Sequence, residues 1–383
     1  MKSLIWIEFR KFIKSKRFFL CLFIMSVITI IFIQQNSYEE SNAKFTIRNK
    51  INREISVTKY ALRGKEGNKE LTNIIKLGEE LRKNHFSMKE GKDTKKYIRS
   101  QIKVNENAIK LNEKKFDLFF MRDSLNYNKS TEQLKLENDL LNELLNKNIE
   151  YENDNNSMKG FNFLKLYFNE VNMIMVLCMI LYISSDAYSG EVEKKTYKIL
   201  YTQPISSKKI FFGKLIGKVL CSMLVIIICI GGWFIYLSIT RGMGSLKYPA
   251  RVFSQGVMKI MTVKDVLVRY LILFIPLCIF ANILGIFVSM ITKKATSTLT
   301  MSLIVSAILY ILSMVMGKVG GIIPIKYIDL FSSVSSGEIS QGIFKYTFSG
   351  ENVLVGCIAC IVVTVILCVI SLNVADKKRF MVE

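Results

Sequence analysis

The chain has 383 residues, of which 50% are hydrophobic and 22% charged, and it carries 53 Lys+Arg against 31 Asp+Glu. Its apolar residues are gathered in blocks without charged residues, each about the 20 residues that cross the hydrocarbon of a bilayer. This distribution excludes a protein built only of soluble cores. We predict an all-α polytopic protein of the cell (plasma) membrane, with six transmembrane helices.

Residues 1–17 are predicted to form an amphipathic helix that lies in the membrane interface, with Ile5 and Phe9 on its apolar face. Residues 18–35 follow as the first transmembrane helix, after a cluster of lysine and arginine. The polar residues 34–38 offer no small-x-small cleavage site. We therefore expect an uncleaved anchor rather than a secretory signal.

Residues 36–160 change abruptly to Lys, Glu, Asn and Leu with no proline, a composition typical of helices. We predict three or four antiparallel helices that form a coiled-coil-like extracytoplasmic domain. The predicted seams are Ile51, Ile55, Leu62; Ile98, Ile102, Asn105, Ile109, Asn112, Phe116, Phe119; Leu136, Leu140, Leu144; and Leu141, Leu145, Ile149. His85, the one histidine of the chain, is expected to be solvated. The domain is either a spacer or cap, or a gate or receptor for something that leaves the membrane.

Five further transmembrane helices complete the predicted set. They are residues 161–185, 215–240, 266–292, 295–317 and 352–375. The segments between and after them are a cytoplasmic coupling loop or helix at 186–214, outer loops at 241–265 and 318–351, the latter with a re-entrant alternative, and a cytoplasmic tail at 376–383.

Basic residues show the expected orientation. They gather before the first span, in the loop 186–214, at residues 293–294 and after the last span. Placing these four groups in the cytoplasm satisfies the positive-inside rule and puts both termini inside. The segment 241–269 is basic too, and is an exception to that rule. The net charge of +22 does not indicate nucleic-acid binding, since no aromatic platforms interleave with a basic groove.

The sequence has no arrangement typical of an enzyme, a metal site or a cofactor site. All eight cysteines fall in predicted spans, where we interpret them as packing residues. Gly213-x-x-x-Gly217 lacks both the spacing and the Ser/Thr of a phosphate-binding loop. We interpret it, and Gly285-x-x-x-Ser289, as small-x-x-x-small faces that let helices approach closely.

The loop 186–214 carries the most information. Glu191 and Glu193 precede a basic run, an order that suits the dipole of a short helix ending before Pro204. A short charged helix held between two spans is a docking element for a soluble partner. An ordinary solvated loop is the alternative.

This loop resembles the membrane subunits of type 2 ABC transporters. The residues that follow the family pattern are Glu191 or Glu193, Thr196, Leu200, Pro204, Ile205, Ser206, Ile210 and Lys214. Lys195 stands where the family has Gly, and Ser207 where it has Arg. The amphipathic N-terminus, the six spans and the polar segment before the last span agree with the same family.

The resemblance implies the permease subunit of an ATP-driven exporter, without an ATPase site or cofactor of its own. A separate ABC ATPase would bind ATP and Mg, and two permease chains would form a homodimer or a heterodimer. The implied ATPase-coupling residues are Glu191, Glu193, Thr196, Leu200, Pro204, Ile205, Ser206, Lys208 and Lys209. The two glutamates are expected to pair with the ATPase across an interface. The family places the N-terminal helix beside the ATPase, although a plain anchor has the same pattern.

Glu170, Asn172 and Asn282 are candidate residues of a translocation path, because polar side chains within spans usually face a bundle interior or an aqueous cavity. If the second span begins near Val171, Glu170 lies at the interface instead. The substrate stays open among an antimicrobial or amphipathic peptide, for export or self-immunity, a lipid, a drug and an ion. The alternative function is a non-transporting sensor or scaffold whose outer coiled coil binds a ligand.

Overall fold

A computed structural model of the chain describes residues 2–63, 68–89, 94–116, 121, 126–127, 129–152, 156–197, 205–254, 257–317, 319–334, 339–341, 344–346 and 353–380. The chain forms two units. The membrane unit comprises residues 1–32, 159–244 and 251–383, and the polar unit comprises residues 33–158 and 245–250. Among the described residues, five helices are long and apolar enough to cross a membrane, or six if a bent pair counts as one span. The chain is thus a multi-pass membrane protein.

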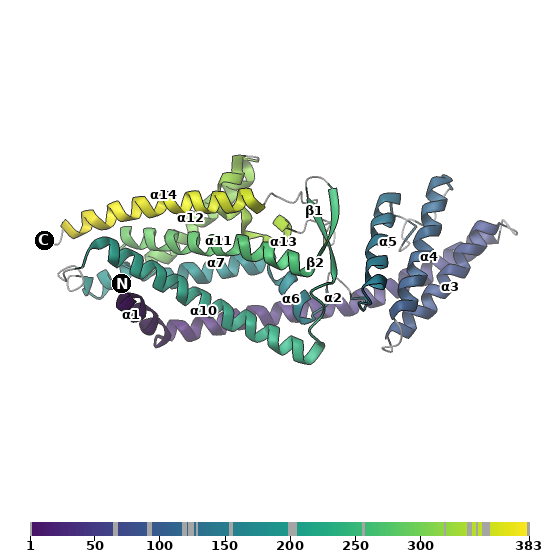
Figure 1. The fold of residues 1–383 in the computed structure, drawn as a ribbon, viewed down its shortest axis with the longest axis horizontal. Coiled ribbons are helices and arrows are strands. Elements are labelled where there is room, and N and C mark those ends of the chain that lie inside the picture. The colour runs from purple at the N-terminus through teal and green to yellow at the C-terminus, as the bar shows by residue number, and fades with distance from the viewer. Residues whose placement is uncertain are drawn as a thin grey trace. The chain divides into compact units, whose positions relative to one another are not determined.

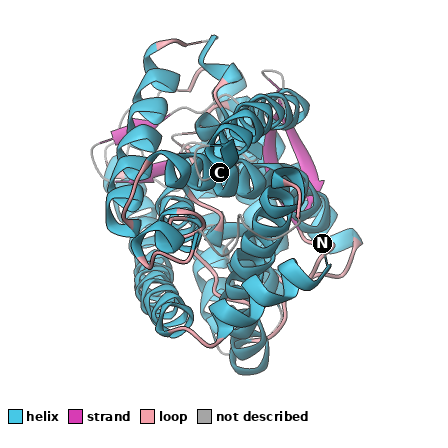
Figure 2. Cartoon of the chain, turned by 90° about the vertical axis from the view of Figure 1, so that its left-hand side faces the viewer, coloured by secondary structure: helices cyan, strands magenta, loops and turns pink. Residues whose placement is uncertain are grey.

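The membrane unit is built mainly of helices. They are α1 (Lys2–Ile13), the first part of α2 (Lys16–Leu62), α6 (Gly160–Tyr167), α7 (Glu170–Ser184), α8 (Ser189–Glu193), α10 (Ser207–Arg241), α11 (Val263–Ile291), α12 (Ala295–Val315), α13 (Leu330–Val334), α14 (Val353–Phe380) and the 3-10 helices η2 (Val319–Ile322) and η3 (Pro324–Ile328). The start of α1 and the end of α14 lie at the same end of this unit (Figure 1), the end that faces the viewer in Figure 2.

Two helices extend beyond the predicted membrane spans. The first span was predicted to end at residue 35, but α2 continues without a break to Leu62. The composition turns polar there, yet no glycine or proline between residues 36 and 62 ends the helix. α10 begins at Ser207, within the segment 186–214 that was predicted as a coupling loop or helix.

The predicted second span, residues 161–185, consists of two helices rather than one. α6 and α7 are bent by 73° across the break between them. The side chain of Asn169 accepts a hydrogen bond from the backbone N–H of Asn172 at 3.0 Å. This N-cap starts a new helix at Glu170, inside a segment whose length and hydropathy alone predict a single span.

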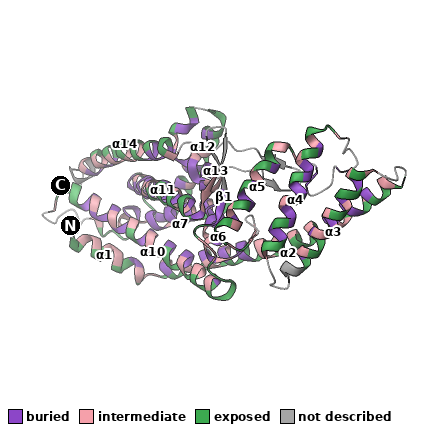
Figure 3. Ribbon diagram, turned by 45° about the vertical axis from the view of Figure 1, so that its right-hand side comes forward, coloured by how far each residue is buried: buried purple, intermediate pink, exposed green. Residues whose placement is uncertain are grey.

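α11 is the most buried of the candidate spans, with 67% of its apolar window inside the protein against 17% for α14. It packs against α7, α12 and α14, and exposed residues line the outer faces of α12 and α14 (Figure 3). A Cβ added at Gly285 would lie 2.9 Å from the Cβ of Ser184. The glycine therefore lets α11 approach α7 closely, as the small-x-x-x-small pattern predicted.

Two short sheets depart from the all-α prediction. β1 (Pro249–Ser254) and β2 (Val257–Thr262) form one of them. β3 (Ile339–Gln341) and β4 (Phe344–Tyr346) pair antiparallel in the other. Both sheets fall in segments predicted as loops, and helices remain the dominant structure.

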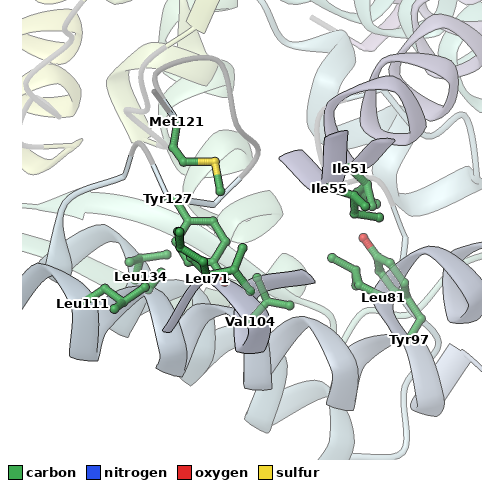
Figure 4. Close-up of a cluster of buried hydrophobic side chains, with 12 residues drawn as sticks. Ile51, Ile55, Leu71, Leu81, Tyr97, Val104, Leu111, Met121, Tyr127 and Leu134 are labelled. Atoms are coloured by element: carbon green, nitrogen blue, oxygen red, sulfur yellow. The ribbon is translucent and has the colours of Figure 1, made fainter. Parts of the chain in front are cut away.

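The described residues of the polar unit form four helical segments: the second part of α2, α3 (Lys69–Lys89), α4 (Thr94–Glu113) and α5 (Thr131–Asn146). Their apolar faces meet in one core, part of which Figure 4 shows. Ile51 and Ile55 of the predicted α2 stripe are 1% and 4% exposed and belong to this core. The number of helices agrees with the three or four predicted.

The predicted seam on α4 is buried in part, since its members Ile98 and Asn105 are 0% exposed. The buried residues that step by four and three are Tyr97, Gln101, Val104, Ala108 and Leu111. Ile102 and Ile109, two members of the predicted seam, are only half-buried, and Phe119 lies outside the described residues. The buried face of α4 is thus wider than the predicted seam, and a polar side chain, that of Gln101, occupies one of its core positions.

Hydrogen bonds between side chains allow polar residues to be buried in the core of this unit. Asn105 Nδ2 donates to Asn138 Oδ1 at 3.0 Å, and both residues are buried. His85 is buried as well, at 2% exposed, with its ring centroid 5.6 Å from that of Tyr97. The expectation of a solvated histidine was wrong, because the imidazole packs against an aromatic ring of the next helix.

Candidate functional site: a buried charge cluster around α10

Charged side chains from four segments of the membrane unit meet beside α10. The charge cluster, as we call it, consists of Glu8, Arg17, Asp186, Glu191, Lys214 and Lys218. Lys214 and Lys218 lie one helical turn apart and are 3% and 4% exposed. Lysine is rarely buried so completely unless acidic groups pair with it. The cluster provides those acids from segments that lie far apart in the sequence.

Lys218 joins α10 to the loop after α7. Its Nζ donates to Asp186 Oδ1 at 2.6 Å and lies 3.9 Å from Glu8 Oε2. Arg17, at the start of α2, places Nη1 2.9 Å from Asp186 Oδ2. Asp186 therefore links α2 and α10 through its two carboxylate oxygens.

Lys214 joins α10 to α8. Its Nζ donates to the carboxylate of Glu191 and, at 2.6 Å, to the backbone carbonyl of Ala187. The same nitrogen lies 3.6 Å from Glu8 Oε1 and 4.9 Å from the ring centroid of Tyr188. These contacts satisfy the ammonium group in a place that water hardly reaches.

The electrostatics of the cluster favour ionised acids. Burial alone would raise the pKa of Glu8, but the positive charges of Lys214 and Lys218 hold that pKa below its ordinary value. The pKa of Asp186 is also lowered, because Lys218 and Arg17 outweigh the opposing effect of burial. The cluster contains three acidic and three basic residues, so its formal charges balance.

Two glycines of α10 bring α1 against this cluster. A Cβ added at Gly213 would lie 3.1 Å from the Cβ of Leu4, and one at Gly217 would lie 2.9 Å from the Cβ of Glu8. The close-approach face predicted from Gly213-x-x-x-Gly217 is present, and the helix that approaches it is α1. A side chain at Gly217 would push Glu8 away from the lysines.

α8 is also attached to the start of α12. Glu193 Oε2 accepts a hydrogen bond from the backbone N–H of Ala295 at 3.2 Å, at the positive end of the α12 dipole. Thr298 Oγ1 lies 2.9 Å from Ser189 Oγ, to which it donates, and 2.5 Å from Thr292 Oγ1. Through Glu191 and Glu193, α8 is thus connected to both α10 and α12.

The end of α8 explains one departure from the family pattern. Lys195, which stands where the family has Gly, has a φ of 56°, in the left-handed region that glycine adopts most readily. Its N–H donates to the carbonyl of Val192 at 3.1 Å, and the N–H of Thr196 donates to that of Glu191 at 2.9 Å. These two bonds form a Schellman motif, which ends a helix with a left-handed residue. The backbone turn is present although its residue differs.

The other predicted coupling residues lie just before or within the first turn of α10. They are Ile205, Ser206 as its N-cap, and the exposed Lys208 and Lys209. Leu200 and Pro204 lie outside the described residues. The expectation that Glu191 and Glu193 pair with another protein stays a prediction, and one oxygen of each carboxylate already has a partner within this chain.

Sequence reasoning missed Glu8, Asp186 and Lys218 as members of a site. Two local signals pointed to them. Glu8 is the one acidic residue of α1, on an otherwise basic and apolar helix. Lys218 follows Lys214 by four residues, on the same face at the start of an apolar run. Neither signal identifies the residues with which Glu8 and Lys218 pair. Those pairs form only because α1 packs on α10.

Each of the three candidate path residues makes a hydrogen bond to a different partner. The carboxylate of Glu170 accepts a hydrogen bond from the Tyr310 hydroxyl of α12. Asn172 is 3% exposed, and its Nδ2 donates at 3.1 Å to the last backbone carbonyl of α6. Asn282 lies fully buried within α11, where its Nδ2 donates to Ser222 Oγ of α10 at 3.1 Å. Glu170 and Asn172 lie at the start of α7.

Comparison with known proteins gives one match. The sequence model of the family described as "ABC-2 family transporter protein" matches residues 2–376, nearly the whole chain. Neither a curated protein nor a solved structure matches the chain.

Proposed function

Since the chain belongs to the ABC-2 transporter family, as its loop motif suggested, we propose that it is the permease subunit of an ATP-driven exporter and is coupled to a separate ATPase through α8. Members of this family are membrane components of ABC transporters, have no ATPase site of their own and typically work with an ABC ATPase. The exporter direction, the plasma membrane as its location and a second permease chain, identical or a sister subunit, are parts of the proposal.

The attachment of α8 to two spans is the observation that supports the proposal. Glu191 holds α8 to Lys214 of α10, and Glu193 holds it to the first turn of α12. A helix of five residues with such contacts moves as one body with the starts of both spans. Force applied to α8 would therefore reach the membrane part without a flexible link.

Most of the exposed charged side chains around α8 are basic, although Glu193 is exposed as well. Lys194 and Lys195 at its end and Lys208 and Lys209 at the start of α10 are all exposed. Because the acids of α8 are engaged within the chain, the lysines are the groups that meet an ATPase, and they favour an acidic surface on it. The glutamates position α8 instead of contacting the partner.

The coupling is reciprocal in this scheme. ATP-driven closure of the ATPases pushes α8. Because the coupling is reciprocal, a change that moves α8 also alters the affinity of the ATPase for ATP. An amphipathic or antimicrobial peptide, a lipid, a drug and an ion all suit a permease with a helical polar unit. A screen for compounds that stimulate ATP hydrolysis by the reconstituted complex would distinguish them.

The test separates association from coupling. The permease is purified from its own membranes with any ABC ATPase that binds it, and both the amount of bound ATPase and its hydrolysis rate are measured. Lys208→Glu with Lys209→Glu lowers the amount of bound ATPase. Thr298→Val removes the hydrogen bond to Ser189 and alters the hydrolysis rate at unchanged binding.

Thr300→Val is the matched control, because the exposed Thr300 bonds only to backbone carbonyls of its own helix. It leaves both readouts unchanged. Failure of any ATPase to copurify with the intact chain would refute the permease assignment. Full ATPase binding by the double lysine variant would refute the docking surface.

A further inference from the structure

α1 and α10 border an apolar groove in the membrane unit, with a volume of about 440 Å³. Its lining residues are Lys2, Ile5, Trp6 and Phe9 of α1 and Leu220, Met223, Leu224 and Ile227 of α10. Trp6 is 61% exposed and Ile227 is 66% exposed. The groove thus lies open on the surface of the unit, along an apolar stretch of a candidate span.

The charge around the groove has one sign. Lys2 is the one charged residue that lines it, and it is exposed. The single acid of α1, Glu8, is turned away into the charge cluster, where Lys214 and Lys218 neutralise it. Arg10, Lys11 and Lys14 of the same N-terminal segment are exposed as well. An anionic group at the mouth of the groove would meet only positive charge from α1.

The composition of the groove fits a lipid. Seven of its eight lining residues are apolar, and the eighth has a long aliphatic stem that ends in an ammonium group. Such a side chain lies along apolar surface while its charge stays at the polar boundary. Tryptophan also favours the interface between hydrocarbon and water. The groove offers apolar contact along its length and a cation where a headgroup would lie.

We propose that this groove binds an acyl chain of an anionic phospholipid, whose phosphate is bound by Lys2. The inference concerns the lipid environment of α1 and does not depend on the proposed coupling to an ATPase. Charge complementarity selects the headgroup, and the apolar walls hold the chain. A lysine near an anionic membrane surface contributes about 1 kcal/mol, which corresponds to an about fivefold preference over a zwitterionic lipid.

The two tryptophans of the chain allow a direct test. The full chain with Trp233→Phe has Trp6 as its one tryptophan, and Trp6→Phe leaves only Trp233 of α10. Each variant is reconstituted into phosphatidylcholine vesicles that contain a small, equal fraction of either brominated phosphatidylglycerol or brominated phosphatidylcholine. Bromine quenches tryptophan only at short range, so the quenching reports lipid occupancy beside each ring.

We expect Trp6 to be quenched by brominated phosphatidylglycerol with about fivefold higher apparent affinity than by brominated phosphatidylcholine, and Trp233 to be quenched equally by both. Lys2→Gln, in the Trp233→Phe chain, abolishes the preference at Trp6. Lys16→Gln removes an exposed lysine that does not line the groove, and it leaves the preference intact.

Four results would overturn the proposal. They are equal quenching of Trp6 by both lipids, the same preference at Trp233, a preference that persists in the Lys2→Gln variant, and absence of quenching by either lipid. The last result would indicate that a second copy of the chain covers the groove. Loss of quenching when the ATPase is added would assign the groove to that protein instead.

Discussion

Gly217 of α10 lies against Glu8 of α1 so closely that a Cβ at the glycine would come within 2.9 Å of the Cβ of the glutamate. The same glutamate lies 3.6 Å from Lys214 and 3.9 Å from Lys218. The absence of a side chain at Gly217 and the ion pairs of Glu8 therefore depend on each other. Close approach of α1 is what brings an acid to two buried lysines.

Gly217→Ala should destabilise the membrane unit by about 1–3 kcal/mol, because the new methyl group forces α1 away from α10. Gly231→Ala is the control in the same helix, since a Cβ there meets nothing within 4 Å. It should be neutral or stabilising by up to about 1 kcal/mol, as alanine is the better helix former. Unfolding in detergent, followed by the reactivity of the buried Cys221, measures both. Equal effects of the two substitutions would contradict a tight α1 contact.

Lys218→Met should lower the free energy of unfolding by about 1–3 kcal/mol, because it leaves the half-buried Asp186 without its nearest lysine and Glu8 without one of its two lysines. Lys209→Met, at an exposed position of the same helix, should change it by less than about 1 kcal/mol. Combining Lys218→Met with Asp186→Asn should recover part of the loss. Strict additivity of the two single effects would show that the residues are not coupled.

The stability of the cluster should fall in acid. Glu8 and Asp186 have folded-state pKa values below their ordinary values of 4.5 and 3.8, so the folded protein binds protons at these sites less readily than the unfolded chain. Their contribution is fully present above those ordinary values and is lost as the pH falls through the lower folded values. Unfolding midpoints should be constant above about pH 5 and should drop below it. The gap between the wild type and Glu8→Gln should narrow over the same acid range; a constant gap would contradict the lowered pKa of Glu8.

Lys195→Gly should stabilise α8 by about 0.5–1 kcal/mol. A left-handed conformation costs a residue with a Cβ about 1–2 kcal/mol, which exceeds the added freedom of glycine in the unfolded chain, about 0.5–1 kcal/mol. Lys194→Gly should have the opposite effect, because Lys194 has a φ of −86° and gains nothing from glycine. Protease resistance of the segment around α8 compares the two. Destabilisation by both would argue against the Schellman turn.

Glu170→Gln should alter transport or substrate-stimulated ATP hydrolysis if this carboxylate lines the path, without lowering the amount of assembled complex. Tyr310→Phe removes the hydrogen bond to Glu170 but keeps its charge. A larger effect of Glu170→Gln than of Tyr310→Phe would show that the carboxylate of Glu170 has a role other than attaching α7 to α12. Unchanged activity of both variants would make Glu170 an interfacial residue.

Several features of this protein followed from the sequence alone. Charge-free runs of about 20 residues predicted the membrane spans, because a charge inside hydrocarbon is costly and a helix satisfies its own backbone. The glycines at 213, 217 and 285 predicted close helix contacts, since a missing side chain is a local property. The acid-to-base order around Glu191 predicted a short helix ending before Pro204, whereas α8 ends at Glu193. With the residues after it, this segment carries the resemblance to the family.

Other features were decided only by the tertiary structure. The periodicity of α4 marks several apolar stripes, and the hydrogen bond of Asn105 to Asn138 helps to determine which face is buried. The sequence does not show which groups pair with Glu191 and Glu193. The packing of α8 on α10 and α12 provides a partner for each within the chain. Helical and apolar patterns arise between residues a few positions apart. The pairing of Glu8 with Lys214 joins segments that lie far apart in the sequence, and such a contact exists only once the helices have packed.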